Sequence, residues 1–369
     1  MRSSTNYALA GPKTFRRGSK KILKKWGSNL QNIEESMREI YQSDGYKPEL
    51  HDKCSYWLET GDLSVFSQEE LETLRVLCPR DQSGAEALIV AYECEPFDYR
   101  KLFIHGIKPH VYIGLRLFPE EWKRKIKEHS LGIDSSVIDT LCATSIPDLK
   151  SNPDWSAIDK LIKSSDGWAT AERYYYFAKQ TCHSGNYGIE WATFIMNVLD
   201  KSGGKVVLTK EQGVHFLQTY RALFPELVER CNRITHQAKE TKMLFNMFGH
   251  PYTITDYEIL PSRYKELWAW SAQSTVAEIT RTAFSNLQYW IEDNKKQWDI
   301  LEDNHDSFLP QCPLYELKEC MKMSEQFMNI ELISPVDGVK FRMKSECKIG
   351  FNWSNKTDKN KLGLREIKW

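Results

Sequence analysis

The stretch Arg75-Val-Leu-Cys-Pro-Arg-Asp-Gln-Ser-Gly-Ala-Glu-Ala-Leu-Ile-Val-Ala-Tyr92 changes character at Asp81. The residues before Asp81 form a short apolar run typical of a strand, and those after it are good helix formers. We therefore expect Asp81 at a strand end, followed by a helix over residues 84–91. A rigid strand end can hold a carboxylate toward a ligand without burying an unpaired charge.

A second carboxylate has similar surroundings in Trp298-Asp-Ile-Leu-Glu-Asp-Asn-His-Asp-Ser-Phe-Leu-Pro310. His305 and Asp306 lie between two short apolar runs, as at the tip of a β-hairpin. If this tip meets the strand end at Asp81, two carboxylates face one point. Oxygen donors in that arrangement suit a pair of Mg²⁺ ions for in-line phosphoryl transfer.

A third stretch, residues 170–188, carries a side-chain stripe with a period of four residues. Tyr175, Lys179, His183 and Tyr187 lie along one face if the stretch is helical. A stripe of aromatics is usually core, but a lysine and an imidazole within it argue against a wholly dry interior. We interpret it as a helix face that contacts a ligand.

These stretches resemble, in order, the motifs of family A (DNA polymerase I-like) DNA polymerases, most closely the bacteriophage type. The residues that carry the resemblance are Asn29-Leu-Gln-Asn-Ile33, Asp81-Gln-Ser-Gly-Ala-Glu86, Lys179–Gly188, Gln273-Ser-Thr275 and His305-Asp306-Ser307. The match runs from about Thr14 to Trp353. It implies a DNA-directed DNA polymerase that extends a primer with dNTPs in DNA replication, and that uses two Mg²⁺ ions.

The resemblance also implies roles for particular residues. Asp81 and Asp306 would be the catalytic residues and the magnesium ligands. The dNTP would be bound by Glu86, His110, Tyr175, Lys179, His183 and Tyr187, with Glu86 against the ribose 2′ position. Primer-template DNA would be contacted by Arg16 or its rival Arg17, and by Asn29, Gln31, Asn32, Gln273 and His305. Tyr175 stands where the family has an arginine, and Arg173 lies two residues before it, so the motif does not place a second cation for the triphosphate at the usual position.

Simpler interpretations stay open for single residues. Glu86 on the first turn of a helix can complement the helix dipole. A lone histidine such as His110 is more often structural, and Gln273 could be a buried, hydrogen-bonded glutamine.

The predicted fold class is α+β: a polymerase palm with an antiparallel sheet and an inserted, mostly helical fingers region. Residues 1–110 would form the template-primer segment and the first palm part, with a surface insertion near 46–74. Residues 111–260 would form the fingers and 261–369 the second palm part, with a long helix over residues 262–292 and a half-buried strand over residues 341–349. No thumb or exonuclease is recognised, and a separately encoded polypeptide could supply them.

Composition sets broad limits. A chain of 369 residues with 41% apolar residues can bury a sizeable core, and its 50 basic and 50 acidic residues cancel. Six basic residues nevertheless fall between Arg16 and Lys25 with no acid among them, a pattern that suits phosphate contacts as well as a solvated tail. Nine cysteines without a CxxC pair indicate reduced thiols and argue against zinc. No apolar run is long enough to cross a bilayer, so a soluble protein is expected. The reduced thiols and the lack of a secretory signal favour a cytoplasmic location, in the host cytoplasm if phage-encoded.

Two other functions compete with DNA synthesis. RNA synthesis on a related palm would need room at the position of Glu86. A non-catalytic nucleic-acid-binding fragment of a disrupted polymerase would have no need of Asp81, Asp306, Lys179 and Tyr187 together.

Overall fold

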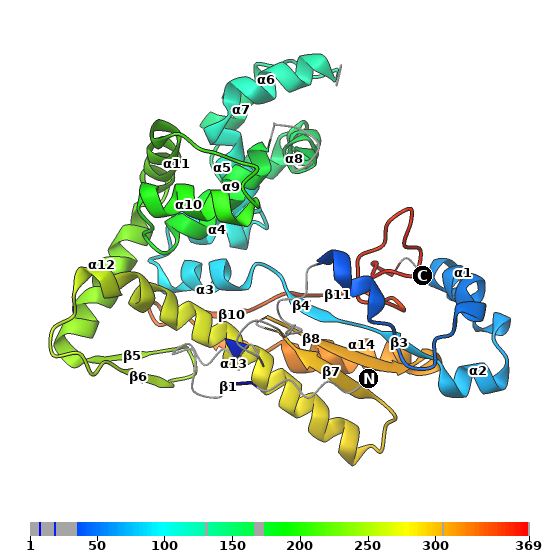
Figure 1. Cartoon of the computed structure of the whole chain (residues 1–369). Coiled ribbons are helices and arrows are strands. Elements are labelled where there is room, and N and C mark those ends of the chain that lie inside the picture. Colours follow the sequence, from blue (N-terminus) through cyan, green and yellow to red (C-terminus); the bar gives the residue numbers. More distant parts are fainter. Residues whose placement is uncertain are drawn as a thin grey trace.

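The computed structural model describes residues 7–8, 18–19, 35–129, 132–165, 173–304 and 306–367. A part built only of helices lies above a part that contains the main sheet, and the two parts are joined through α3 and α12 (Figure 1). The α+β class is therefore confirmed. Among the described residues, none of the helices combines the length and the apolar character that a membrane span requires.

The main sheet is antiparallel and is built around one long strand, β8 (Ser307–Pro313). On one edge of β8 lie β3 (Arg75–Leu77) and β4 (Arg80–Gln82), and β11 (Ser345–Cys347) pairs with the far side of β4. On the other edge lies β7 (Asp299–Asp303), which forms the expected hairpin with β8. Pro79 separates β3 from β4 because proline has no N–H to donate to the ladder.

Two helices cover one face of this sheet. α13 (Tyr264–Asp293) and α14 (Leu317–Met328) pack against each other and against β8. Gln82 donates to the Thr280 hydroxyl of α13 (2.6 Å), and Arg80 donates to the Met321 carbonyl of α14 (2.7 Å). Because side chains alternate along a strand, Asp81 points to the opposite face, which the two helices leave uncovered.

The helical part lies on that opposite side (Figure 1). Its helices are α4 (Asp98–Ile104), α5 (Pro109–Leu117), α6 (Pro119–Glu128), α7 (Val137–Ala143), α8 (Trp155–Ser164), α9 (Tyr174–Gly185), α10 (Trp191–Lys201) and α11 (Lys210–Leu223). Proline at the first turn of α5 and α6, and a capping box between Thr209 and Gln212 at α11, set where these helices start. α5 packs against α9, with Gly114 next to Ala178.

A buried ion pair joins the helical part to the sheet part. Arg230 of α12 (Pro225–Thr241) donates two hydrogen bonds to Glu93, the last residue of α3 (Ala85–Glu93). Ser271 of α13 donates to the other oxygen of Glu93. Glu93 is 5% exposed and Arg230 is fully buried, so three helices converge on one desolvated charge pair.

Residues 46–74 meet the C-terminal segment at the end of the sheet. Residues 46–74, which the sequence suggested as a surface insertion, contain α1 (His51–Thr60) and α2 (Gln68–Thr73). Trp57 of α1 is 1% exposed and packs edge-on against Phe351, so this segment contributes to the core. The remaining elements are the strand pairs β1 (Tyr7–Ala8) with β2 (Gly18–Ser19), β5 (Met243–Phe245) with β6 (Pro251–Thr253), and β9 (Glu331–Ile333) with β10 (Lys340–Arg342).

The strand expected over residues 341–349 is wrong in detail. It is two short strands, β10 and β11, that belong to different sheets. The Ser83 N–H binds the Lys344 carbonyl between them, so the chain leaves one sheet and joins the other at this point. The alternation of apolar and charged residues correctly indicated extended backbone, but it could not show which strands pair.

Candidate active site

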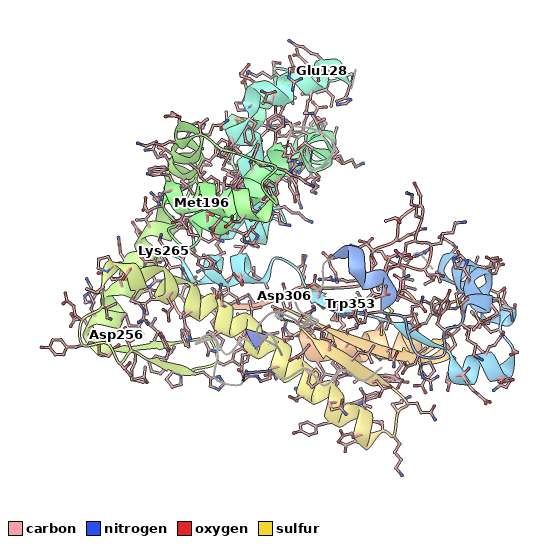
Figure 2. The ribbon with its side chains drawn as sticks, in the orientation of Figure 1. Glu128, Met196, Asp256, Lys265, Asp306 and Trp353 are labelled. Atoms are coloured by element: carbon pink, nitrogen blue, oxygen red, sulfur yellow. The ribbon has the colours of Figure 1, made fainter. Side chains whose placement is uncertain are left out.

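Asp81 and Asp306 are brought together by the main sheet. Asp81 lies directly opposite Ser307 in the pairing of β4 with β8, and the Gln82 N–H donates to the Asp306 carbonyl (2.9 Å). The strand and the hairpin tip thus meet as the sequence suggested. Asp306 lies in the middle of the molecule, between the helical part and the sheet (Figure 2).

A third carboxylate stands beside them. Glu346 of β11 is the direct cross-strand partner of Asp81, and both side chains are exposed on the same face. The sequence had suggested only a half-buried strand over residues 341–349, which includes Glu346. Its proximity to Asp81 depends on strand order, which no local pattern reports.

The electrostatics of Asp81 follow from this crowding. Its side chain reaches solvent, yet desolvation by the surrounding protein, and then the charges of Asp306 and Glu346, raise the pKa of Asp81 to about 7. Asp81 makes no ion pair within the part of the chain that the structure describes. Acidic oxygens that repel one another in this way are stabilised by a cation.

Glu86 and Tyr187 form one contact across two helices. Gly84 adopts a left-handed conformation (φ 64°) and starts α3, which places Glu86 on its first turn. The Tyr187 hydroxyl, just beyond the end of α9, donates to the Glu86 carboxylate (2.5 Å). Tyr187 is 8% exposed, so its ring is held in place.

The face of α9 next to this contact carries positive charge. Lys179 and His183 are exposed on α9, and His110 at the start of α5 lies 5.9 Å from the ring of Tyr175 and 6.0 Å from that of His183. Burial, followed by the charges of His183, Lys179 and Lys108, lowers the pKa of His110 to about 3. His110 is therefore neutral at physiological pH and can still donate a hydrogen bond.

Lys201 is a cation at this face that sequence reasoning missed. It ends α10 and donates to the Gln180 side chain (3.2 Å). Desolvation, and then the positive charge of Lys179, lower the pKa of Lys201, while the negative charge of Glu86 raises it. Lys201 therefore lies close enough to both residues to interact with their charges. Lys201 is remote from the motif in the sequence, so only the packing of α10 on α9 reveals it.

Comparison with known proteins gives a fold but no close relative. No family model matches the sequence, and no curated protein matches it. Among solved structures, the chain is similar to the POL domain of Pol1 from M. smegmatis in complex with DNA primer-template and dNTP, with a TM-score of 0.58 and 15% identity. The chain has a DNA polymerase-like fold. The match covers 95% of this chain and 47% of that one, so this chain spans about half the length of the solved structure.

The remaining residues expected at the site are either outside the described part of the chain or partly or fully buried. Arg16, Arg17, Asn29, Gln31, Asn32 and His305 lie outside the described residues. Gln273 is half-buried on α13, between Ala272 and Ser274, which are buried. Arg173, the other arginine near the stripe, is buried at the start of α9.

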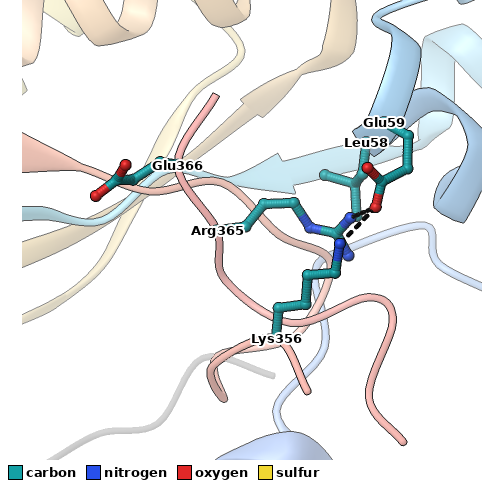
Figure 3. A pocket seen from close by; sticks show the side chains of 5 residues that line it. All are labelled: Leu58, Glu59, Lys356, Arg365 and Glu366. Carbon is teal, nitrogen blue, oxygen red and sulfur yellow. Dashed lines mark hydrogen bonds and ion pairs between the residues drawn. The ribbon is translucent and has the colours of Figure 1, made fainter. Parts of the chain in front are cut away.

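A pocket of about 250 Å³ lies away from these residues. Leu58, Glu59, Lys356, Arg365 and Glu366 line it, between α1 and the C-terminal segment (Figure 3). Glu59 pairs with both Lys356 (2.6 Å) and Arg365. Three of its four charged side chains thus pair with one another, so the pocket resembles a stabilising contact between two chain segments more than a ligand site.

Proposed function

We propose that the protein is a DNA-directed DNA polymerase that adds dNTPs to a primer 3′ end by phosphoryl transfer. The observation that carries the proposal is that the pairing of β4 with β8 brings Asp81 and Asp306, from distant parts of the chain, close enough for the charge of Asp306 to raise the pKa of Asp81. The likeness of the fold to a polymerase domain solved with primer-template and dNTP supports it.

The donor set at this face fits magnesium. Asp81, Asp306 and Glu346 offer carboxylate oxygens, the ligands that Mg²⁺ prefers. Desolvation, and then the charges of Asp306 and Glu346, raise the pKa of Asp81, and a bound cation would favour its ionised form. When bound, Mg²⁺ would lower the pKa of the primer 3′-hydroxyl and neutralise charge on the transferring phosphate.

The residues of α9 and α10 are suited to hold the triphosphate. Lys179 and Lys201 supply positive charge, and the neutral imidazoles of His110 and His183 can donate hydrogen bonds to phosphate oxygens. Lys201 would be the second cation that Tyr175 does not provide. Catalysis would then rest on positioning and electrostatic stabilisation more than on covalent chemistry.

Glu86 and Tyr187 are suited to select the sugar. With the Tyr187 hydroxyl bonded to it, the Glu86 carboxylate is fixed between α3 and the end of α9. A ribose 2′-hydroxyl placed there would collide with the carboxylate or break this hydrogen bond. The enzyme should therefore prefer deoxyribonucleotides.

Primer extension tests the proposal. The full chain is incubated at low salt with a labelled primer-template, Mg²⁺ and dNTPs or rNTPs, and DNA binding is measured in parallel by fluorescence anisotropy. We expect extension with dNTPs, and a loss of more than about 100-fold in Asp81→Asn and Asp306→Asn with DNA binding retained. Asp52→Asn, an exposed carboxylate on α1, is the matched control.

Each other result has a definite meaning. Extension at wild-type rates by either aspartate variant would exclude the two-aspartate site. Extension with rNTPs in preference to dNTPs would indicate RNA synthesis. DNA binding without any extension would favour a non-catalytic nucleic-acid-binding protein.

A further inference from the structure

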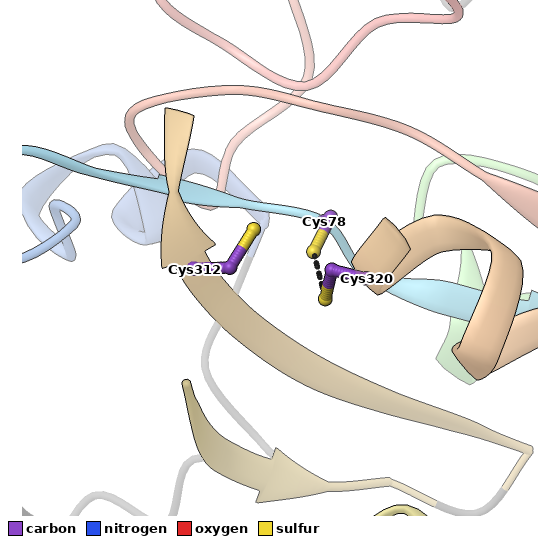
Figure 4. Close-up of side chains that lie close together, drawn as sticks. All are labelled: Cys78, Cys312 and Cys320. Atoms are coloured by element: carbon purple, nitrogen blue, oxygen red, sulfur yellow. Dashed lines mark hydrogen bonds between the residues drawn. The ribbon is translucent and has the colours of Figure 1, made fainter. Parts of the chain in front are cut away.

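Three buried cysteines meet on the covered side of the main sheet. Cys78 lies between β3 and β4, Cys312 lies in β8 and Cys320 lies in α14, and each is 0% exposed. Their sulfur atoms all lie within 4.8 Å of one another, and the Sγ atoms of Cys78 and Cys320 are 3.4 Å apart (Figure 4). No CxxC pair announces this group in the sequence, because its members come from three separate elements.

The spacing suits a metal ion bound by thiolates. A Zn–S bond of about 2.3 Å in a tetrahedral site places the sulfur atoms roughly 3.8 Å apart. The observed separations, 3.4 Å for one pair and at most 4.8 Å for the others, bracket that value. Small rotations about the side-chain torsions would move the sulfur atoms by about a few tenths of an ångström and bring all three to bonding distance of one ion.

The local charge also suits such an ion. Arg80 is 3% exposed, its contacts are the Met321 carbonyl and the Ser345 hydroxyl, and its Nε has no hydrogen-bond partner among the described residues. No carboxylate in the described part of the chain pairs with it. A buried cation without a counter-charge is costly, and three thiolates around a divalent ion carry one net negative charge that would balance it.

Cysteine binds metal as the thiolate, so each of the three thiols would release its proton to solvent on binding. Soft thiolate sites select ions of the zinc type over magnesium.

We propose that Cys78, Cys312 and Cys320 bind one thiophilic divalent metal ion in a structural site that joins the β3–β4 connection, β8 and α14. A further sulfur is at hand for the fourth position: Cys347 pairs with Arg80 across β4 and β11, and its Sγ lies 3.8 Å from the Cys78 carbonyl oxygen. It would have to turn its side chain toward the group. The ion would fix the backbone three residues before Asp81.

Metal binding by the purified, reduced full chain tests the site without any need for polymerase activity. ZnCl₂ is added, excess is removed by dialysis, and zinc is measured by mass spectrometry together with the thermal unfolding midpoint. We expect one equivalent of zinc and a higher midpoint in the wild type. Cys312→Ala should lose both, and Cys54→Ala, which removes an equally buried thiol in α1, should retain both.

A second measurement covers the case in which Cys312→Ala does not fold. Co²⁺ titrated into the wild type should give thiolate-to-metal charge-transfer absorption that saturates at one equivalent and is reversed by Zn²⁺. The absence of that absorption would overturn the proposal, and so would full zinc binding by Cys312→Ala. A Cys78–Cys320 disulfide in protein purified without reductant would overturn it as well, by assigning the group to thiol oxidation.

Discussion

The Tyr187 hydroxyl donates a 2.5 Å hydrogen bond to the Glu86 carboxylate and so connects the end of α9 to the first turn of α3. α3 begins a few residues after Asp81, and α9 carries Lys179. One hydrogen bond therefore links the strand of the proposed metal site to the helix of the proposed triphosphate site. A nucleotide bound between them would rest against this pair.

Trimming Glu86 should change sugar selection. In Glu86→Ala we expect rNTP incorporation to rise relative to dNTP by at least about tenfold, because the clash with the 2′-hydroxyl is removed. Overall activity should fall, because Tyr187 loses its acceptor. The measurement is single-turnover extension with a ribonucleotide and its deoxy counterpart in competition.

Tyr187→Phe is the matched control for that experiment. It removes the hydrogen bond, costs about 0.5–1.5 kcal/mol of stability, and leaves the carboxylate in place. A smaller change in sugar preference than in Glu86→Ala is expected. If Glu86→Ala leaves the ratio of rNTP to dNTP unchanged, Glu86 serves only the helix dipole.

The raised pKa of Asp81 predicts a pH-dependent stability. In the metal-free protein its pKa is about 7, against an ordinary value of 3.8, so the folded state favours the neutral acid. The stability that this provides is full below about pH 4 and is lost as the pH rises through about 7. Asp81→Asn, which stays neutral, should therefore raise the unfolding midpoint at about pH 8 and change it little at about pH 4. MgCl₂ should raise the midpoint of the wild type at about pH 8 and not that of Asp81→Asn.

Glu346 provides a control on the cause of that shift. Glu346→Gln removes a negative charge opposite Asp81, so the pKa of Asp81 should fall, and the loss of stability of the metal-free protein with rising pH should begin at lower pH. Glu331→Gln removes a carboxylate from β9, in a different sheet, and should leave this pH dependence unchanged. An unchanged pH dependence in Glu346→Gln would mean that desolvation and the charge of Asp306 set the pKa without Glu346.

Local patterns were sufficient for most elements of the fold. The change from strand to helix after Asp81, the hairpin before Asp306 and the long helix α13 each depend on residues close in the sequence. The division of residues 341–349 between two sheets was missed, because strand pairing is decided by distant partners.

The candidate site shows the same contrast between local motifs, which the sequence reveals, and contacts between distant segments, which it does not. Asp81, Asp306, Glu86 and Lys179 were found because each lies in a recognisable short motif. Glu346 and Lys201 were missed because they reach the site only through the pairing of β11 with β4 and the packing of α10 on α9. The three-cysteine group was missed for the same reason, since its sulfurs come from three elements.

Lys179 and Lys201 should both contribute to nucleotide binding. Each single change to alanine should lower kcat/KM for dNTP by about 10- to 100-fold, the value of a charged hydrogen bond to phosphate, with little effect on DNA affinity. Lys127→Ala, an exposed lysine on α6, is the charge-matched control and should have no effect. Equal loss of DNA affinity and dNTP use in Lys201→Ala would instead assign Lys201 to the duplex.

The Arg230–Glu93 pair should determine how firmly the helical part is joined to the sheet part. Both side chains are buried, and Glu93 also accepts a hydrogen bond from Ser271. Arg230→Met leaves a buried carboxylate without its counter-charge and should cost about 3–5 kcal/mol in urea unfolding. Adding Glu93→Gln should recover part of that loss, because the unpaired charge is then removed.

Arg124→Ala breaks the exposed pair with Glu128 on α6 and should change stability by no more than about 0.5 kcal/mol. A loss in Arg230→Met as small as that of Arg124→Ala would show that the junction does not depend on this ion pair.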